Sequence, residues 1–422
     1  MSELGKLTRV GAGRIVEDVK RNRQRIKELG PGIITGGAGD DPAGVVTYTA
    51  VGASTGFSLL WLLLLSTPMM IAVQDMAARV AVITGKSLPE IIRAFYSRKL
   101  SVFIVLSLSV ANIITIGADL QGVSAVLSLV TGIKSADILI FVTALIAYFV
   151  MFRSYRAVKR FFIGFTAVLV AYVVAAVMAK PDVKLVLLNT FIPQLKLNTA
   201  FFMAALGLLG TTISPYLLFW QASEEKEEHK SVAQAKEVAW DTAVGMIYSN
   251  LIAYSIILVG GLILYKSGQP LDTVKEAAMA LLPLGKENAF ILFTVGILAA
   301  GFLAIPILAG STAYAVADTF GWREGLDHKV SDAKGFYTVF FGALVIGDLI
   351  YISPFSAVQA LYYSQILDGI LLPVLVGILL LLNNNAQIVG EYKNSRFNNI
   401  FGWLTLVVSL AFVLSLLGQM IF

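Results

Sequence analysis

The stretch GPGIITGGAGDDPAGVVTYTAVGASTGF, residues 30–57, decides the fold of this chain, because it is apolar enough for a membrane yet unsuited to one continuous helix. Four glycines and one proline fall within residues 36–44. Proline lacks a backbone donor, and each glycine costs about 1 kcal/mol inside a helix. The adjacent carboxylates Asp40 and Asp41 cost a few kcal/mol more in a bilayer. We therefore predict a broken helix.

A second apolar stretch, GLLGTTISPYLLFWQ at residues 207–221, gathers helix breakers and hydroxyl groups in the same way. If each half of the chain holds five helices, both breaks lie in the first helix of their half. Interrupted helices at matching positions indicate an inverted-repeat transporter with a midplane site. Two proline kinks without a ligand are the simpler alternative, but a kink does not require the acid Asp41.

The composition supports a membrane protein. Of 422 residues, 57% are hydrophobic and 14% are charged, against roughly 25% charged in a soluble domain. This excludes a water-soluble enzyme and a disordered chain, and the net charge of +5 forms no basic stripe for nucleic acid. The absence of cysteine and the presence of only two histidines exclude thiolate chemistry and a histidine-rich metal centre.

Eleven apolar segments are long enough to be membrane spans. They cover residues 31–57, 58–82, 101–131, 136–152, 161–179, 199–220, 241–265, 288–320, 335–352, 355–382 and 398–421. With the N-terminus inside, the inner segments hold 24 Lys and Arg residues and the outer segments hold 7. The positive-inside rule then predicts a cytoplasmic N-terminus and an extracytoplasmic C-terminus. We expect a multi-pass protein of the plasma (inner) membrane.

The expected organisation has four parts. A cytoplasmic segment, 1–30, precedes a first repeat of five helices at 31–180. A second repeat of five helices follows at 199–382, and an eleventh helix occupies 398–421. The acidic run at 224–228 is most simply a solvated cytoplasmic loop, with attraction of cations to the inner mouth as the alternative.

The first break favours a cation. Unwound carbonyls are free acceptors, the end of a half-helix is negative, and Asp41 adds a full charge. Neither break contains Lys, Arg or His. Carboxylate, hydroxyl and carbonyl oxygens suit a hard divalent ion.

Nearly the whole chain resembles the NRAMP family of divalent-metal transporters. The resemblance rests on GPG…DP…T…GA..GF.LLW (30–61), QxxAARxxxxTGK (74–86), ANII…DL (111–120), LAAG (298–301), FGW (320–322), SQIL (364–367) and LLP (371–373). It implies an all-α, LeuT-like inverted repeat of five plus five helices and an eleventh helix, with helices 1 and 6 broken around the metal site. The ion is then the substrate, and no cofactor is expected.

Two departures from the family motifs bear on the cargo. The family's Asp-Pro-Gly-Asn is here Asp41-Pro42-Ala43-Gly44, and its Met-Pro-His is Ser214-Pro215-Tyr216. A hard hydroxyl thus replaces the thioether that favours softer transition metals. We expect the lost side chains to leave room for a partly hydrated Mg²⁺, with Mn²⁺ also admitted. This pattern resembles the NRAMP-related magnesium transporter subgroup.

Proton coupling is expected to be absent. The family's helix 3 carries Asp-Leu-x-Glu, whereas this chain has Asp119-Leu120-Gln121-Gly122. The sixth-helix histidine is missing, and the ninth span, 335–352, has no arginine. The alternative reading is a proton-coupled Mn²⁺/Fe²⁺ importer. An amino-acid symporter would need a site without the repelling Asp41, and an intramembrane hydrolase lacks a catalytic pair.

The expected metal ligands are Asp41, the Ser214 hydroxyl and backbone oxygens near Ala38, Gly44 and Thr211, with Gln365 as a contributor. Tyr216 is expected to shape the pocket wall, and Asp40 to attract cations at the entrance while pointing away from Asp41. Asp368 shares a helix face with Gln365, and the two are either site residues or a structural pair. Asp119 is either a remnant of a proton path or an anchor. The expected partners are the metal ion and the bilayer, with no nucleic acid, for a monomeric protein.

Overall fold

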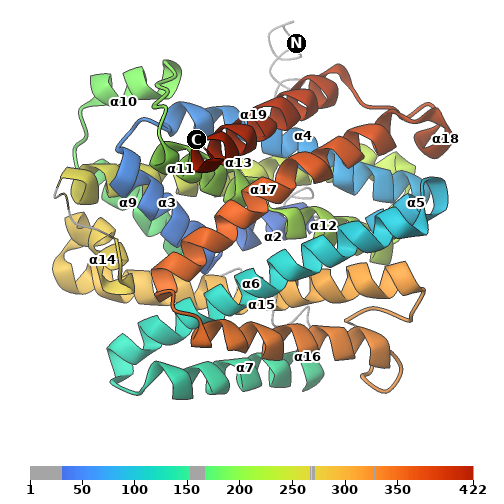
Figure 1. The fold of residues 1–422 in the computed structure, drawn as a ribbon, viewed down its shortest axis with the longest axis horizontal. Coiled ribbons are helices and arrows are strands. Elements are labelled where there is room, and N and C mark those ends of the chain that lie inside the picture. Colours follow the sequence, from blue (N-terminus) through green and yellow to red (C-terminus); the bar gives the residue numbers. More distant parts are fainter. Residues whose placement is uncertain (1–30, 153–166, 267, 269–270, 327, 422) are drawn as a thin grey trace, which may run out of the picture.

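A computed structural model describes residues 31–152, 167–266, 268, 271–326 and 328–421, and this part of the chain is helical without a β-strand (Figure 1). The α-helices are α2 (Pro31–Ala38), α3 (Pro42–Thr55), α4 (Leu60–Thr84), α5 (Leu88–Phe95), α6 (Arg98–Thr131), α7 (Ser135–Phe152), α9 (Val170–Met178), α10 (Val183–Phe191), α11 (Thr199–Thr212), α12 (Pro215–Glu227), α13 (Ala235–Gly260), α14 (Val274–Ala278), α15 (Lys286–Phe320), α16 (Lys334–Asp348), α17 (Ala357–Asn384), α18 (Ala386–Val389) and α19 (Arg396–Ile421). Short 3₁₀ or π turns join or extend them: η1 (Ala167–Leu169), η2 (Val232–Gln234), η3 (Gly261–Tyr265), η4 (Met279–Leu284) and η5 (Leu349–Ile352).

Each expected span coincides with a helix or a pair of helices. Eight helical segments within the described residues are long and apolar enough to cross a membrane, and α7 is a shorter apolar helix. The first span is divided between α2 and α3, and the fifth is described only from residue 167 onward. The 1–30 segment lies outside the described residues, and the division into two five-helix repeats stays a prediction.

Both predicted helix breaks are confirmed. Helix α2 ends at Ala38 and α3 begins at Pro42, with Asp41 as the N-cap. Helix α11 ends at Thr212 and α12 begins at Pro215, with Ser214 as the N-cap. In each case proline stands at the first helical position, where its missing N–H is not needed.

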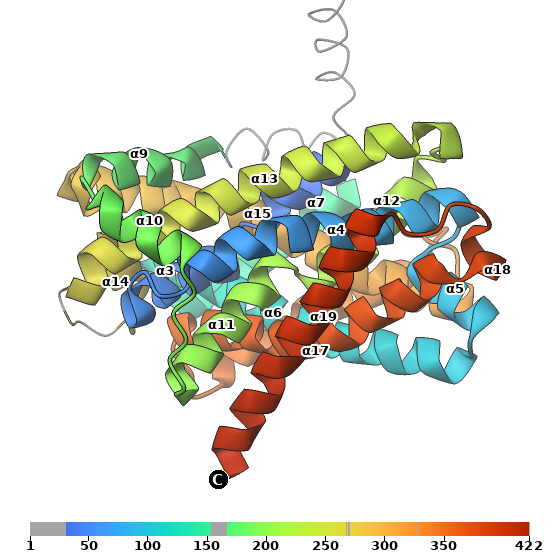
Figure 2. The same cartoon turned by 90° about the horizontal axis from the view of Figure 1, so that it is seen from above.

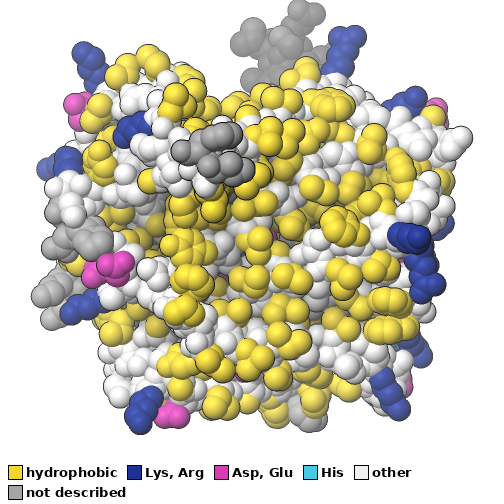
Figure 3. All heavy atoms as spheres, viewed as in Figure 1, with side chains coloured by type: hydrophobic (Ala, Val, Ile, Leu, Met, Phe, Trp, Pro, Cys, Tyr) yellow, Lys and Arg dark blue, Asp and Glu magenta, His cyan; other side chains and the backbone are white. Residues whose placement is uncertain are grey.

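The broken helices lie inside a shell of longer ones (Figures 1 and 2). Helices α2 and α3 pack against α13, while α11 packs against α3 and α17. Helices α6 and α15 run side by side, with α16 packed against both. Apolar side chains dominate the face seen in Figure 3, and the Lys and Arg side chains lie near its edges, as a lipid-facing surface requires.

Close helix contacts depend on glycine. A Cβ atom added at Gly210 on α11 would lie 2.0 Å from the Gln365 carbonyl oxygen on α17, and one at Gly369 would lie 2.3 Å from the Leu206 carbonyl oxygen. Small residues of this kind let helix backbones approach in a membrane. The two glycines therefore fix how α17 lies against α11.

We expect Gly210→Ala to destabilise the fold, because the added methyl group meets backbone atoms that cannot rotate away. Overpacking of this kind costs about 1–3 kcal/mol. Thermal unfolding of the detergent-solubilised protein measures the effect. Gly342→Ala on α16 is the matched control, since nothing lies within 4 Å of its Cβ position. Equal melting temperatures for the two variants would contradict this packing argument.

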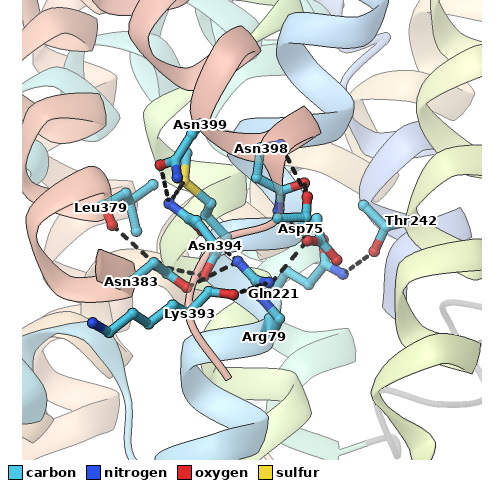
Figure 4. A network of polar contacts seen from close by, with 12 residues as sticks. Asp75, Arg79, Gln221, Thr242, Leu379, Asn383, Lys393, Asn394, Asn398 and Asn399 are labelled. Carbon is cyan, nitrogen blue, oxygen red and sulfur yellow. Dashed lines mark hydrogen bonds and ion pairs between the residues drawn. The ribbon is translucent and has the colours of Figure 1, made fainter. Parts of the chain in front are cut away.

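A polar network joins the C-terminal parts of α4 and α17 to the start of α19 (Figure 4). Arg79 on α4 donates to the side-chain oxygens of Asn383 and Asn394 and forms an ion pair with Asp75 at 3.8 Å. Asp75 also accepts a hydrogen bond from Asn398. These contacts hold the three helices together at this end of the molecule.

The acidic run at 224–228 is not the solvated loop expected from the sequence. It forms the last turn of α12 and its C-cap, and Glu224 and Glu225 are buried. Lys226 lies 2.9 Å from Glu90 on α5, 2.9 Å from Asp318 on α15 and 2.7 Å from Glu324 after α15. Tertiary packing of α12 against α5 and α15 thus buries charges that an isolated segment would leave in water.

Candidate functional site

Asp41 lies where the first helix breaks. Its side chain accepts a hydrogen bond from the Gly44 backbone N–H, which makes it the N-cap of α3. The positive end of the helix dipole stabilises a carboxylate at this position. The residue is 1% exposed, so its charge is removed from solvent.

The Tyr216 hydroxyl connects the two broken helices. Its oxygen lies 2.8 Å from the Ala38 carbonyl oxygen and 3.2 Å from Asp41 Oδ2, and its O–H donates to these acceptors. Ala38 is the last residue of α2, so its carbonyl oxygen accepts no hydrogen bond from a following helical turn. Tyr216, expected only to line the pocket wall, therefore lies where a carboxylate and an unwound carbonyl converge.

The expected open space beside Gly44 is absent in this conformation. A Cβ atom at Gly44 would lie 2.7 Å from Thr211 Oγ1 and 3.1 Å from Asp41 Oδ1. The Thr211 hydroxyl fills the volume that the family's asparagine would need. This oxygen is buried, and it lies against the Tyr48 hydroxyl.

Ser214 is engaged within its own break. Its hydroxyl donates to the carbonyl oxygens of Gly210, at 3.1 Å, and Thr211, at 2.9 Å. These are carbonyls left without helical partners at the end of α11. In this structure the Ser214 hydroxyl therefore caps free carbonyls at the end of α11. Its proton is used in these bonds, and only its oxygen lone pairs could bind a ligand.

Three further polar residues surround this region. Asp119 on α6 accepts a hydrogen bond of 3.0 Å from the Ala43 backbone N–H, which anchors the start of α3. Asp119 Oδ2, Gln365 Oε1 and both carboxylate oxygens of Asp368 are buried without partners. The Asp368 carboxylate is close enough to interact electrostatically with Asp41. Helix α17 thus contributes polar groups that its own contacts leave unsatisfied.

Asp40 points away from Asp41, as expected. Its Oδ1 accepts a hydrogen bond of 3.0 Å from the Ser249 hydroxyl on α13. Asp40 is fully buried, so the expected position at an entrance is wrong for this conformation. The close packing of α2 against α13, where a Cβ atom at Gly36 would lie 2.3 Å from the Gly245 carbonyl oxygen, encloses it.

Ser249 and Tyr48 were missed by the sequence reasoning. Tyr48 is fully buried, and its hydroxyl lies against the Thr211 side chain. The signal for Tyr48 was its spacing, because residues 41, 44 and 48 follow the i, i+3, i+7 pattern of one helix face. Ser249 lies in a distant helix, so no sequence pattern connects it to Asp40.

The ionisable carboxyl groups here have no basic partner in the described part of the chain. Among the described residues, no ion pair includes Asp40, Asp41, Asp119 or Asp368. In the same part of the chain no three acidic or histidine side chains are grouped tightly enough to hold a metal. Carbonyl and hydroxyl oxygens would have to complete any metal site. This donor set suits a hard cation that binds through few carboxylates.

Family and structural comparisons agree with this architecture. The family described as natural resistance-associated macrophage protein-like (Nramp) matches residues 32–419. The chain belongs to this family. It is accordingly an integral, multi-pass membrane protein with the LeuT-like fold.

Two relatives are divalent metal cation transporters named MntH. The protein of Bacillus subtilis is 24% identical over 392 residues, covering 91% of this chain and 90% of its own. The protein of Klebsiella pneumoniae is 24% identical over 420 residues, covering 97% and 98%.

Solved structures show the same fold. A manganese transporter of Eremococcus coleocola aligns with a TM-score of 0.74 at 21% identity, over 93% of this chain and 86% of that one. The nucleobase-cation symporter Mhp1 aligns with a TM-score of 0.56 at 14% identity, over 93% and 92%.

Proposed function

We propose that this protein carries divalent metal ions across the plasma membrane, with Mg²⁺ as its main cargo and Mn²⁺ as a second one. Family membership and the MntH relatives support a metal transporter rather than an enzyme. Alternating access around the two broken helices would expose the site to each side in turn. In this structure Ala38, Asp41, Thr211, Ser214 and Tyr216 are 0–2% exposed.

The observation that carries the proposal is the position of the Tyr216 hydroxyl. A single atom already lies within 3.2 Å of both Asp41 Oδ2 and the Ala38 carbonyl. A small cation at this point would receive one full and one partial negative charge. The remaining proposed ligands are Gly44, Thr211, Ser214 and Gln365, and Asp40, Asp119, Asp368 and Tyr216 are assigned supporting roles.

The donor set supports Mg²⁺. Every proposed ligand atom is oxygen, and Ser214 takes the place of a thioether, so the site has no soft ligand to favour transition metals. Mg²⁺ usually keeps several waters and binds through one or two carboxylates. Because Thr211 fills the space beside Gly44, a partly hydrated ion requires Thr211 and Gly44 to move apart from their positions in this structure. The metal-transporting relatives support Mn²⁺ as the second cargo.

Transport without proton coupling is the second part of the proposal. Gly122 replaces the glutamate of coupled members, and a Cβ atom there would lie 2.9 Å from the Leu361 side chain of α17. Packing therefore occupies the direction in which that glutamate would extend. We further propose a monomer with a cytoplasmic N-terminus and an extracytoplasmic C-terminus, on the Lys/Arg distribution.

Uptake into proteoliposomes tests the proposed cargo and mechanism. We expect Mg²⁺ uptake down its gradient, inhibition by external Mn²⁺, and no change of an internal pH dye. The oxygen-only site should give no strong preference for Mn²⁺ or Cd²⁺ over Mg²⁺. Liposomes without protein correct for leakage. Mg²⁺-driven acidification, or Mn²⁺ uptake without Mg²⁺ uptake, would instead support the proton-coupled Mn²⁺/Fe²⁺ importer.

A further inference from the structure

A series of buried hydrogen bonds connects the two helix breaks through α6 and α15. At the first break, Asp119 on α6 accepts a hydrogen bond of 3.0 Å from the Ala43 backbone N–H, in the first turn of α3. At the second break, the Ser311 hydroxyl on α15 donates to the Tyr216 carbonyl oxygen at 2.9 Å, in the first turn of α12. Each half-helix that follows a break is therefore attached, at its first turn, to a long helix.

A third hydrogen bond joins the two long helices, which run side by side (Figure 1). The Asn112 side-chain amide on α6 donates to the Thr312 hydroxyl on α15 at 3.0 Å, and both residues are 1% exposed. Asn112 precedes Asp119 by seven residues, so the two share one face of α6. Thr312 directly follows Ser311, and adjacent residues of a helix point about 100° apart, so α15 reaches both α6 and α12. The attachment thus runs from α3 through α6 and α15 to α12.

Close packing keeps these contacts in place. A Cβ atom at Gly301 on α15 would lie 2.4 Å from the Val123 side chain of α6 and 3.3 Å from the Pro42 ring of α3. A Cβ atom at Gly310 would lie 2.7 Å from the Trp220 ring of α12. Interiors packed to this density transmit the shift of one helix to its neighbours. Helix α15 therefore limits the movement of both half-helices in this structure.

The groups held in this way converge on the proposed cargo position. Asp41 is the N-cap of α3 and lies two residues before Ala43. Tyr216 places its hydroxyl oxygen 3.2 Å from Asp41 Oδ2. A shift of either half-helix would change this distance. Ligands that are fixed before an ion arrives bind it more tightly, because less ordering is required on binding.

We propose that Asp119, Asn112 and Ser311 are positioning residues, which hold the two half-helices at the separation that binds the cargo ion. They act through Asp41 and Tyr216 and do not touch the ion. Asp119 serves as a hydrogen-bond acceptor, so its oxygen is required and its charge is not. The proposal rests on the proposed function, because it takes Asp41 as a ligand of the cargo.

Two substitutions of Asp119 test the attachment of α3 to α6. Asp119→Asn keeps an acceptor oxygen for the Ala43 N–H, whereas Asp119→Leu has a similar size and no acceptor. Without divalent ions, hydrogen exchange at the Ala43 amide of the protein in nanodiscs should be accelerated only in Asp119→Leu. Mg²⁺ affinity by titration calorimetry should fall about tenfold in Asp119→Leu, the equivalent of one hydrogen bond, and stay close to the wild-type value in Asp119→Asn.

Asn112→Leu tests the link between α6 and α15 without altering either half-helix. The Thr312 hydroxyl keeps a hydrogen bond of 3.0 Å within α15, so no buried donor is left without an acceptor there. We expect Asn112→Leu and Ser311→Ala each to lower Mg²⁺ affinity about fivefold. Asn383→Leu is the matched control, because this buried asparagine near the end of α17 donates to the Met76 carbonyl oxygen of α4 at 3.1 Å. It should lower the melting temperature and leave Mg²⁺ affinity unchanged.

The outcomes separate a positioning role from a merely structural one. Equal losses of Mg²⁺ affinity in the two Asp119 variants would overturn the proposal, because the charge would then be what matters. Unchanged affinity in Asn112→Leu and Ser311→Ala, with melting temperatures lowered as in Asn383→Leu, would also overturn it. A wild type that bound no Mg²⁺ would refute the proposed cargo instead. The exchange rates of the Ala43 amide would still support the attachment if they differed between the Asp119 variants, and overturn it if they were equal.

Discussion

Asp41→Ala is expected to abolish Mg²⁺ and Mn²⁺ uptake. The substitution removes the carboxylate that, with the Ala38 carbonyl, surrounds the position of the Tyr216 hydroxyl. Loss of about 3 kcal/mol of ion binding lowers affinity about 100-fold, and a buried charged ligand contributes at least this much. Initial uptake rates over a range of ion concentrations in proteoliposomes measure the effect. At Mg²⁺ concentrations that saturate uptake by the wild type, we expect the variant to transport little.

Two matched variants show whether the effect belongs to the site. Asp348→Asn removes an acid from the end of α16, where it is half-buried and accepts a hydrogen bond of 2.8 Å from Thr143. It should keep wild-type uptake. Asp41→Asn keeps the shape and can still accept from Gly44, but it should transport poorly because the charge is lost. Wild-type uptake by Asp41→Ala would remove Asp41 from the site.

Lys226→Met is expected to have the largest effect on stability. The Lys226 ammonium lies between Glu90, Asp318 and Glu324, which come from α5, α15 and the segment after α15. Its side chain is 22% exposed and that of Asp318 is 1% exposed, so water compensates little. Removing one partner of a buried ion pair costs about 3–5 kcal/mol. Unfolding of the detergent-solubilised protein by heat or denaturant measures this loss.

The charge state of Glu324 provides the control. Burial, followed by repulsion from Asp318, raises the pKa of Glu324 to about 9. This side chain is therefore protonated at pH 7, and Glu324→Gln should change stability little. Adding Asp318→Asn to Lys226→Met should recover part of the loss, because one unpaired charge disappears. Equal destabilisation by Glu324→Gln and Lys226→Met would contradict this assignment of charges.

Lys226 also has a bearing on transport. It lies on α12, the half-helix that begins at the second break and carries Tyr216 near its start. The ion pairs fix the far end of this half-helix to α5 and α15, while Gln221 donates to Thr242 on α13 at 2.8 Å. Any movement of α12 that opens the site must therefore disturb one of these polar contacts.

The positions of the helices followed from local sequence. Continuous apolar runs have no internal turn signals, so they predict long helices, and proline with glycine predicts the breaks. The polar run at 224–228 shows the limit of this reasoning. Its composition suits a loop in water, but α5 and α15 supply the partners that let it be buried in a helix. Such partners are distant in sequence and leave no local pattern.

The site shows the same division. Asp41 could be predicted from the sequence because a carboxylate within an apolar span is costly unless it binds a partner. Tyr216 and Thr211 could be predicted because they lie at the matching break in the second half of the chain. The sequence also suggested that Asp40 and Asp41 face different neighbours, although the partner of Asp40, Ser249 on α13, was not foreseen. By contrast, the space expected beside Gly44 depended on Thr211, which reaches it from another helix. The replacement of the family's asparagine by Gly44 does not reveal, from the sequence, which other residue occupies the space that the asparagine would fill.

The sequence by itself determined that this chain spans a membrane, where its helices break, and that the acid Asp41 lies in a break without a basic neighbour. These properties are set by composition and by spacing along the chain. Tertiary structure alone decided that Tyr216 bonds to both Ala38 and Asp41, that Asp40 faces Ser249, and that Lys226 holds three acids. Those contacts join residues from separate helices, and helix packing rather than chain order fixes their distances.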